Sequence, residues 1–123
     1  MQKLDKLFLC HPTCTTCKKA RAFLDAAGLA YTERDIRHNK PSAAELRAWH
    51  KASGLPLRRF FNTSGALYRE LGLSAKLPSM SEDEQIALLS LDGMLVRRPI
   101  LVHDGGVLVG FSQAAWEEAL ITS

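Results

Sequence analysis

The sequence predicts a single α/β domain, residues 1–123, built from a β-α-β unit, a helical segment and a β-β-α unit. Two observations carry this prediction. Near the N-terminus a short apolar run is followed by a helical pattern, and near the C-terminus two short apolar runs precede another helix. A chain of 123 residues is long enough for one domain and buries roughly two thirds of the surface that its unfolded form exposes.

The first unit is predicted from apolar spacing. Residues 4–10 form an apolar run that stops before Pro12, which is typical of a buried strand followed by a loop. A helix is predicted next, ending near Gly28, from apolar residues at helical spacing: Cys17, Ala20, Phe23, Leu24 and Ala27. Residues 30–36 follow directly and predict a second strand, parallel to the first through a right-handed crossover.

The middle of the chain is predicted to be a helical insertion, residues 41–93, between core segments 1–40 and 94–123. Ser42-x-x-Glu45 and Ser81-x-x-Glu84 are capping-box patterns that mark two helix starts. Gly54, Gly72 and Gly93 stand where helices would end, and residues 57–71 predict two short helices joined through 62–65.

The last unit is predicted to be a β-hairpin followed by a helix. Residues 100–102 and 107–109 are apolar and are separated by His103-Asp104-Gly105-Gly106, a sequence suited to a turn. Ser112 can cap a final helix that carries Trp116.

Charge and hydropathy exclude several classes of protein. The net charge is +3, and the first 61 residues hold 12 of the 16 Lys and Arg but only 5 of the 13 Asp and Glu. The basic residues are interspersed with acids, which favours an ordinary solvated surface or a small anionic substrate over direct nucleic-acid binding. No apolar run approaches the ~18 residues of a membrane span, so we expect a cytoplasmic protein without a membrane partner.

Three cysteines, Cys10, Cys14 and Cys17, are spaced C-x3-C-x2-C. An odd count argues for reactive or metal-binding thiols rather than a disulfide framework. An iron–sulfur cluster held by three cysteines occurs in enzymes with a larger α/β barrel, and structural zinc would need a fourth ligand that the spacing does not supply. We therefore expect no metal.

The remaining interpretation places Cys14 and Cys17 as a Cys-x-x-Cys pair where the first strand passes into the first helix. Free amide N–H groups and the helix dipole favour a thiolate there, and Lys18, Lys19 and Arg21 add positive charge. Cys14 is the expected nucleophile, and Cys17, one turn further on, is the expected resolving thiol. Cys10 is expected to be a small buried residue. Two ordinary reduced cysteines are the alternative.

The segments Cys14-Thr15-Thr16-Cys17-Lys18-Lys19-Ala20-Arg21 and Arg97-Arg98-Pro99-Ile100 resemble those of the arsenate reductase (ArsC)/Spx family. The resemblance spans nearly the whole chain. It implies a thioredoxin-like fold, with a four-stranded mixed sheet and flanking helices, and a cis peptide bond at Pro99 that faces the active-site cysteine.

For function, the resemblance implies a thiol–disulfide oxidoreductase that acts on a small oxyanion or disulfide. It carries over two oxyanion-binding arginines, Arg58 and Arg98, whereas Gly110 stands where glutathione-dependent arsenate reductases have a third. The hydroxyls of Thr15 and Thr16 can add hydrogen bonds. We expect no bound cofactor; glutathione, glutaredoxin or thioredoxin would supply electrons.

The resemblance also implies an alternative, because Spx is a redox-sensing transcriptional regulator. It binds the α subunit of RNA polymerase, and its switch is a disulfide between cysteines at the positions of Cys14 and Cys17. An arginine at the position of Arg98 is linked to that switch. The sequence around Arg58 is closer to the reductases, which favours the enzyme.

Overall fold

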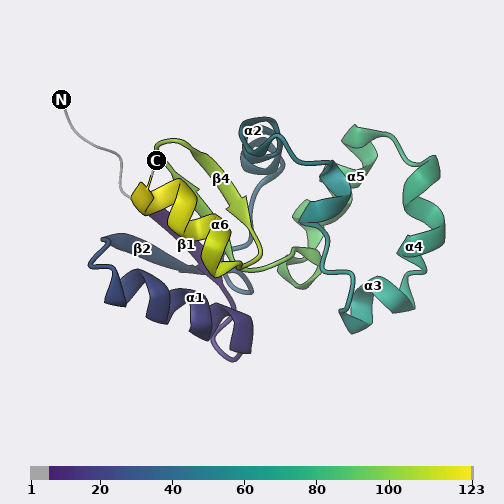
Figure 1. Ribbon diagram of the computed structural model, residues 1–123. Coiled ribbons are helices and arrows are strands. Elements are labelled where there is room, and N and C mark those ends of the chain that lie inside the picture. The colour runs from purple at the N-terminus through teal and green to yellow at the C-terminus, as the bar shows by residue number, and fades with distance from the viewer. Residues whose placement is uncertain (1–5, 123) are drawn as a thin grey trace. The chain divides into compact units, whose positions relative to one another are not determined.

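The computed structural model describes residues 6–122 (Figure 1). The chain forms two compact units. One is made by the chain up to Asp35 and from Arg98 onward, and the other is made by Ile36–Arg97.

The first unit contains a four-stranded sheet with strand order β2-β1-β3-β4. Its strands are β1 (Lys6–Cys10), β2 (Tyr31–Asp35), β3 (Ile100–His103) and β4 (Gly106–Val109). β1 and β2 are parallel, whereas β1 with β3 and β3 with β4 are antiparallel. The predicted four-stranded mixed sheet is thereby confirmed. Residues 4 and 5 of the predicted first strand lie outside the described residues.

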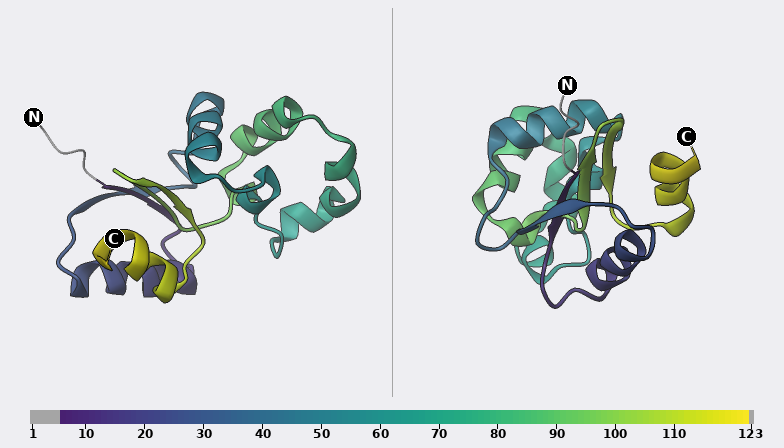
Figure 2. Two further views of the ribbon diagram at one scale, coloured as in Figure 1. Left: turned by 45° about the horizontal axis from the view of Figure 1, so that its top comes forward. Right: turned by 90° about the vertical axis from the view of Figure 1, so that its left-hand side faces the viewer.

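Two helical segments cover one face of this sheet (Figure 2). They are α1 (Thr15–Ala26) and α6 (Gln113–Glu117), and the chain continues from α6 into a π-helical turn, η4 (Glu118–Thr122). The α1 residues Cys17, Ala20 and Leu24 pack into one apolar cluster with Trp116 of α6, and β1 and β3 also contribute to it. Ser112 caps α6 as predicted, because its Oγ accepts a hydrogen bond from the Ala115 N–H at 3.4 Å.

The second unit is helical. Its longer helices, α2 (Ala43–Ser53) and α5 (Glu82–Leu91), contact each other. Both predicted capping boxes are present, with Ser42 and Ser81 as the capping residues. The shorter elements are η1 (Leu57–Phe60), α3 (Ala66–Glu70), α4 (Leu73–Lys76), η2 (Leu77–Ser79) and η3 (Gly93–Leu95). The two short helices predicted within residues 57–71 are η1 and α3.

Two glycines of this unit differ in detail from the prediction. Gly54 follows α2 in a left-handed conformation, as a helix stop does. Gly72, in contrast, lies between α3 and α4, and Gly93 opens the short helix η3 rather than closing α5. Within residues 6–122, no helix combines the length and the hydropathy needed to cross a bilayer.

Candidate active site

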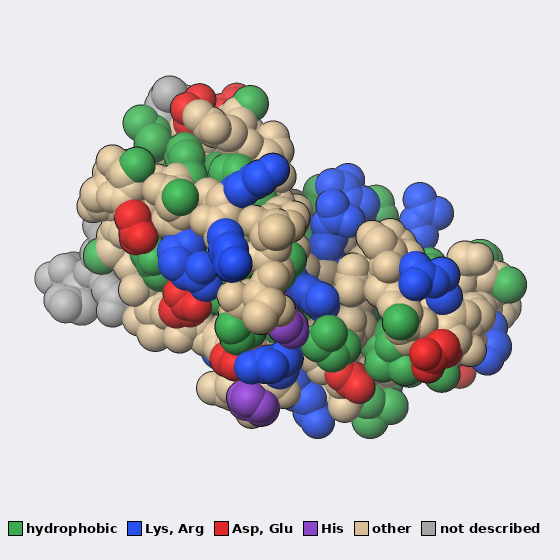
Figure 3. Space-filling model, turned by 90° about the horizontal axis from the view of Figure 1, so that it is seen from below, with side chains coloured by type: hydrophobic (Ala, Val, Ile, Leu, Met, Phe, Trp, Pro, Cys, Tyr) green, Lys and Arg blue, Asp and Glu red, His purple; other side chains and the backbone are tan. Residues whose placement is uncertain are grey.

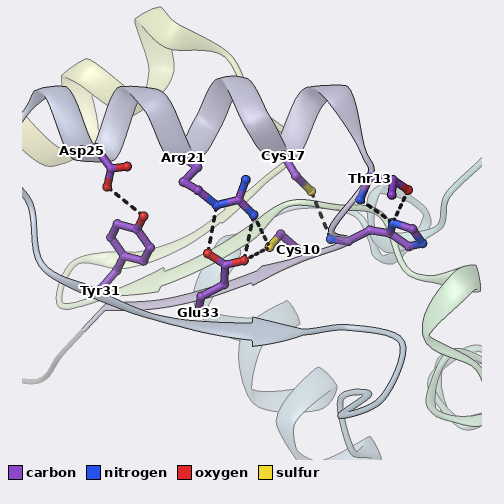
Figure 4. Close-up of polar contacts among 8 residues, drawn as sticks. Cys10, Thr13, Cys17, Arg21, Asp25, Tyr31 and Glu33 are labelled. Carbon is purple, nitrogen blue, oxygen red and sulfur yellow. Dashed lines mark hydrogen bonds and ion pairs between the residues drawn. The ribbon is translucent and has the colours of Figure 1, made fainter.

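Cys14 is the N-cap residue of α1 and its side chain is half-buried. The loop before it is tied by backbone and side-chain contacts. The Cys14 N–H donates to the carbonyl of His11 at 3.2 Å, and Nδ1 of His11 accepts from the Thr13 N–H at 3.2 Å (Figure 4). Thr15 and Thr16 are the first two residues of the helix and both are exposed. Cys14 therefore stands where the unpaired N–H groups of a 12-residue helix begin.

Cys17 lies one turn further along α1 and its side chain is fully buried. Its sulfur accepts a hydrogen bond from the His11 backbone N–H at 3.4 Å, and Cys17 belongs to the same buried cluster as Cys10, with Cys14 packed against that cluster. These neighbours lower the pKa of Cys17 to about 6, the Cys10 thiol contributing most, and the charge of Arg98 acts in the same direction against the effect of burial. A buried thiolate is thus favoured at neutral pH.

Cys10, the last residue of β1, belongs to a polar cluster with Arg21 of α1 and Glu33 of β2 (Figure 4). Its thiol donates to Glu33 Oε2 at 3.0 Å, and Nη2 of Arg21 donates to the Cys10 sulfur at 3.2 Å. The neighbouring Cys17 thiol, burial and the Glu33 carboxylate raise the pKa of Cys10, so it remains a neutral thiol.

Arg21 has a more specific role than the general positive charge predicted for it. Its Nε and Nη2 bind both oxygens of Glu33, at 3.0 and 2.7 Å, and its guanidinium lies over the Phe8 ring at 5.8 Å from the centroid. This bidentate pair lowers the pKa of Glu33. In Figure 3, which views the molecule from the side of α1, Lys and Arg side chains lie scattered among acidic and uncharged surface.

Arg98 and Pro99 immediately precede β3, and the peptide bond between them is cis. Pro99 is buried, and its carbonyl accepts a hydrogen bond from the Gly110 N–H at 2.8 Å. Gly110 has a φ of +74°, a backbone conformation that favours glycine. Gly110, the position at which the resemblance implies a third arginine in glutathione-dependent reductases, is therefore a turn residue in this chain.

Arg58 lies in the other unit, exposed on η1. Together with His50, Tyr68 and Gln85 it lines a cavity of about 660 Å³ in that unit. Arg98, by contrast, acts on Cys17 within the first unit. The structure thus places Cys14, Cys17, Arg98 and Pro99 in one unit, and Arg58 in the other.

Sequence reasoning did not identify the cluster of Cys10, Arg21 and Glu33. The odd cysteine at a strand end and an acidic residue within a neighbouring strand were the available signals. In the described part of the chain, no group of three or more His, Cys, Asp or Glu side chains is arranged to hold a metal ion.

Comparison with known proteins places this geometry in a family. The model of the ArsC family matches residues 9–119. The uncharacterized protein YusI of Bacillus subtilis is 48% identical over 111 residues, which cover 90% of this chain and 94% of that protein. An arsenate reductase of Rhizobium meliloti is 34% identical over 92 residues, covering 75% of this chain and 64% of the reductase.

This chain is also similar to a transcriptional regulator and to solved structures. The global transcriptional regulator Spx of Staphylococcus epidermidis is 26% identical over 102 residues, covering 83% of this chain and 76% of the regulator. The crystal structure of an ArsC family related protein from Bacteroides fragilis superposes with a TM-score of 0.91 at 50% identity, covering 95% of this chain and 98% of that one. The fold is thioredoxin-like, and the chain belongs to the ArsC family.

Proposed function

We propose that the protein is a thiol–disulfide oxidoreductase in which Cys14 is the nucleophile and Cys17 the resolving thiol. One observation carries the proposal: the half-buried Cys14 is the N-cap of α1, and the fully buried Cys17 lies one turn further along the same helix. An incoming substrate reaches Cys14 first, and the second thiol is only one helical turn away.

The reaction with a disulfide substrate has two steps. The Cys14 thiolate attacks one substrate sulfur, which forms a mixed disulfide and releases the other sulfur as a thiolate. The Cys17 thiolate then attacks the Cys14 sulfur, which forms the Cys14–Cys17 disulfide and releases the second substrate thiolate. The substrate gains two electrons and the protein loses two. All three cysteines are free thiols in the structure, and we infer that the cycle starts from this state in a reducing cytoplasm.

A small oxyanion is the second substrate class that we propose, supported by the similarity to an arsenate reductase. Cys14 would displace water from arsenic(V), and attack of Cys17 on the Cys14 sulfur would pass two electrons to arsenic and release arsenic(III). Arg98 would bind the oxyanion, with the Thr15 and Thr16 hydroxyls and the N–H groups of α1. Arg58 is the further ligand that the family resemblance implies. Glutathione, glutaredoxin or thioredoxin would reduce the Cys14–Cys17 disulfide again.

Disulfide mapping and steady-state assays test this proposal. We expect mild oxidation to yield a Cys14–Cys17 disulfide by peptide mass spectrometry, and Cys14→Ser to abolish reduction of a small disulfide or of arsenate with each donor. Cys17→Ser should retain the first step and accumulate a mixed disulfide on Cys14. Thr13→Ser, in the same loop, is the matched control. Wild-type turnover by Cys14→Ser would overturn the proposal.

A redox-dependent regulator is the second candidate, favoured by the similarity to Spx over 83% of the chain. The same Cys14–Cys17 disulfide would then control docking to the α subunit of RNA polymerase rather than turnover. A pull-down with the C-terminal domain of that subunit, under oxidising and reducing conditions, separates the two. Binding only in the oxidised state, without turnover, would support the regulator, and turnover without binding would support the enzyme.

A further inference from the structure

The helical second unit contains two adjoining cavities that the thiol chemistry does not use. The larger has a volume of about 660 Å³ and the smaller of about 270 Å³, and both are lined by Thr63, Tyr68 and Ser74. All their lining residues lie between His50 and Gln85, where the chain curves from α3 through α4 to α5 (Figure 1). The larger volume lies within the range of roughly 300–1,000 Å³ that is typical of small-molecule sites.

Tyr68 lies where the two cavities meet. Its side chain is 7% exposed, and its ring packs against the Phe61 ring with the centroids 6.2 Å apart. Within the described part of the chain, no group forms a hydrogen bond with the Tyr68 hydroxyl, and the oxygen is not sealed from solvent. A nearly buried polar group of this kind takes its partner from what fills the cavity. The cavities are therefore provided with a fixed hydroxyl donor.

The charges around Tyr68 favour an anion as that partner. Arg58 lines the larger cavity and Arg69 the smaller one. The Arg69 guanidinium is held in place because its Nη1 donates to the Ser64 carbonyl at 2.8 Å. Among the described residues that line either cavity, Glu82 is the only acidic one. Two guanidinium groups and a hydroxyl together suit a carboxylate or a phosphate group, whose oxygens accept charge-assisted hydrogen bonds.

An apolar wall, formed by Leu57, Leu77 and Met80, lines the larger cavity. Leu57 and Leu77 are only 6% and 4% exposed. Hydrogen bonds hold this wall in place, because Nε2 of Gln85 donates to the carbonyls of Leu77 and Met80 at 3.3 and 3.1 Å. An inorganic oxyanion would leave the wall uncovered, so the cavity suits a ligand that carries an apolar body as well as a charge.

We propose that the larger cavity binds a small organic anion. Its carboxylate or phosphate group accepts hydrogen bonds from the Tyr68 hydroxyl and the Arg58 guanidinium, and its apolar body packs against the apolar wall. The proposal gives Arg58 a partner within its own unit. It goes beyond the proposed function, because the site needs neither Cys14 nor Cys17.

Heteronuclear NMR titration of the full chain tests the proposal with four probes. Benzoate and phenyl phosphate carry the two kinds of anionic group on the same ring, benzyl alcohol lacks the charge, and inorganic phosphate lacks the apolar body. At least one of the two aromatic anions should give saturable shifts at the amides of Thr63, Tyr68 and Ser74, with a Kd of about 1 mM. Benzyl alcohol and inorganic phosphate should bind at least about tenfold more weakly. The tighter of the two anions identifies the ligand as a carboxylate or a phosphate.

Two variants test the assigned donors. Tyr68→Phe keeps the ring against Phe61 and removes only the hydroxyl, so the Kd of the anion should rise about tenfold while the chain stays folded. Arg58→Gln should weaken both anions by about tenfold and leave the affinity for benzyl alcohol unchanged. Tyr31→Phe is the matched control, because the Tyr31 hydroxyl donates to Asp25 at 2.8 Å in the first unit, and it should bind as the wild type does.

Several results would overturn the inference. These are an unchanged Kd in Tyr68→Phe, equal binding of benzoate and benzyl alcohol, shifts confined to the first unit, or no saturable shift with either anion at about 10 mM. Cys14→Ser should bind the anion with wild-type affinity. Failure of the thiol chemistry would therefore leave this site intact, and absence of anion binding would leave the proposed function intact.

Discussion

Arg98 combines two roles that single substitutions can separate. Its charge helps to lower the pKa of Cys17, and the proposed function gives it a second role as a ligand for an anionic substrate. We expect Arg98→Ala to raise the pKa of Cys17 and to reduce kcat/KM for arsenate by about 10- to 100-fold, because a charge-assisted hydrogen bond is lost. Steady-state kinetics against pH, with arsenate and with an uncharged disulfide, measure both effects.

Arg98→Lys is the matched control for that substitution. A lysine keeps the positive charge near Cys17 but cannot bind an oxyanion through two N–H groups, so the pH profile should recover more fully than the arsenate rate. Unchanged arsenate kinetics in Arg98→Ala would contradict this role.

The positions of Cys14 and Cys17 on α1 could be predicted because a strand–loop–helix pattern places them by local rules. The neighbours of Cys10 could not, because they depend on strand register. β1 and β2 pair with Phe8 opposite Glu33 and Cys10 opposite Asp35. Side chains alternate between faces, so a shift of one residue would turn Glu33 away from Cys10. The residues of a single strand do not specify that register.

At the scale of elements, the residues at which helices start could be predicted from the sequence, whereas contacts between segments far apart in the sequence could not. The two Ser-x-x-Glu patterns identify the capping boxes of α2 and α5 because all their partners lie within four residues. Gly93 shows the limit of local reasoning. The sequence identifies it only as a helix stop, whereas in the structure the backbone of Ile36 passes directly over it.

That contact predicts the effect of Gly93→Ala. An added Cβ would meet the Ile36 carbonyl oxygen at 1.9 Å, and a backbone atom cannot move aside as a flexible side chain does. The free energy of unfolding should fall by at least about 3 kcal/mol. Urea denaturation followed by circular dichroism measures the loss.

Gly54→Ala is the control for Gly93→Ala. Gly54 has a φ of +69° and nothing within 4 Å of an added Cβ, so the substitution costs only the left-handed conformation, about 1–2 kcal/mol. A smaller loss for Gly93→Ala than for Gly54→Ala would contradict the steric explanation.

At the scale of the whole molecule, the titration of Cys17 makes the free energy of unfolding depend on pH. Folding lowers the pKa of Cys17 from 9.0 to about 6, so between these values the unfolded chain binds more protons than the folded one. The free energy of unfolding of the reduced protein therefore rises with pH across this window, by up to about 1.4 kcal/mol per pH unit. Above it the sign reverses, because the raised pKa of Cys10 makes deprotonation easier in the unfolded chain.

Denaturation of the reduced protein at pH 6, 7.5 and 9 should therefore show increasing stability, and two samples should lack most of that increase. In Cys17→Ser the titrating thiol is absent, and in the oxidised wild type Cys17 is held in a disulfide and has no proton to lose. The 4 histidines also titrate near the lower end of the window, but they are common to all three samples and cancel in the comparison. Equal slopes in all three would show that folding leaves Cys17 with its ordinary pKa, and the thiolate that is proposed to resolve the mixed disulfide would then be missing at neutral pH.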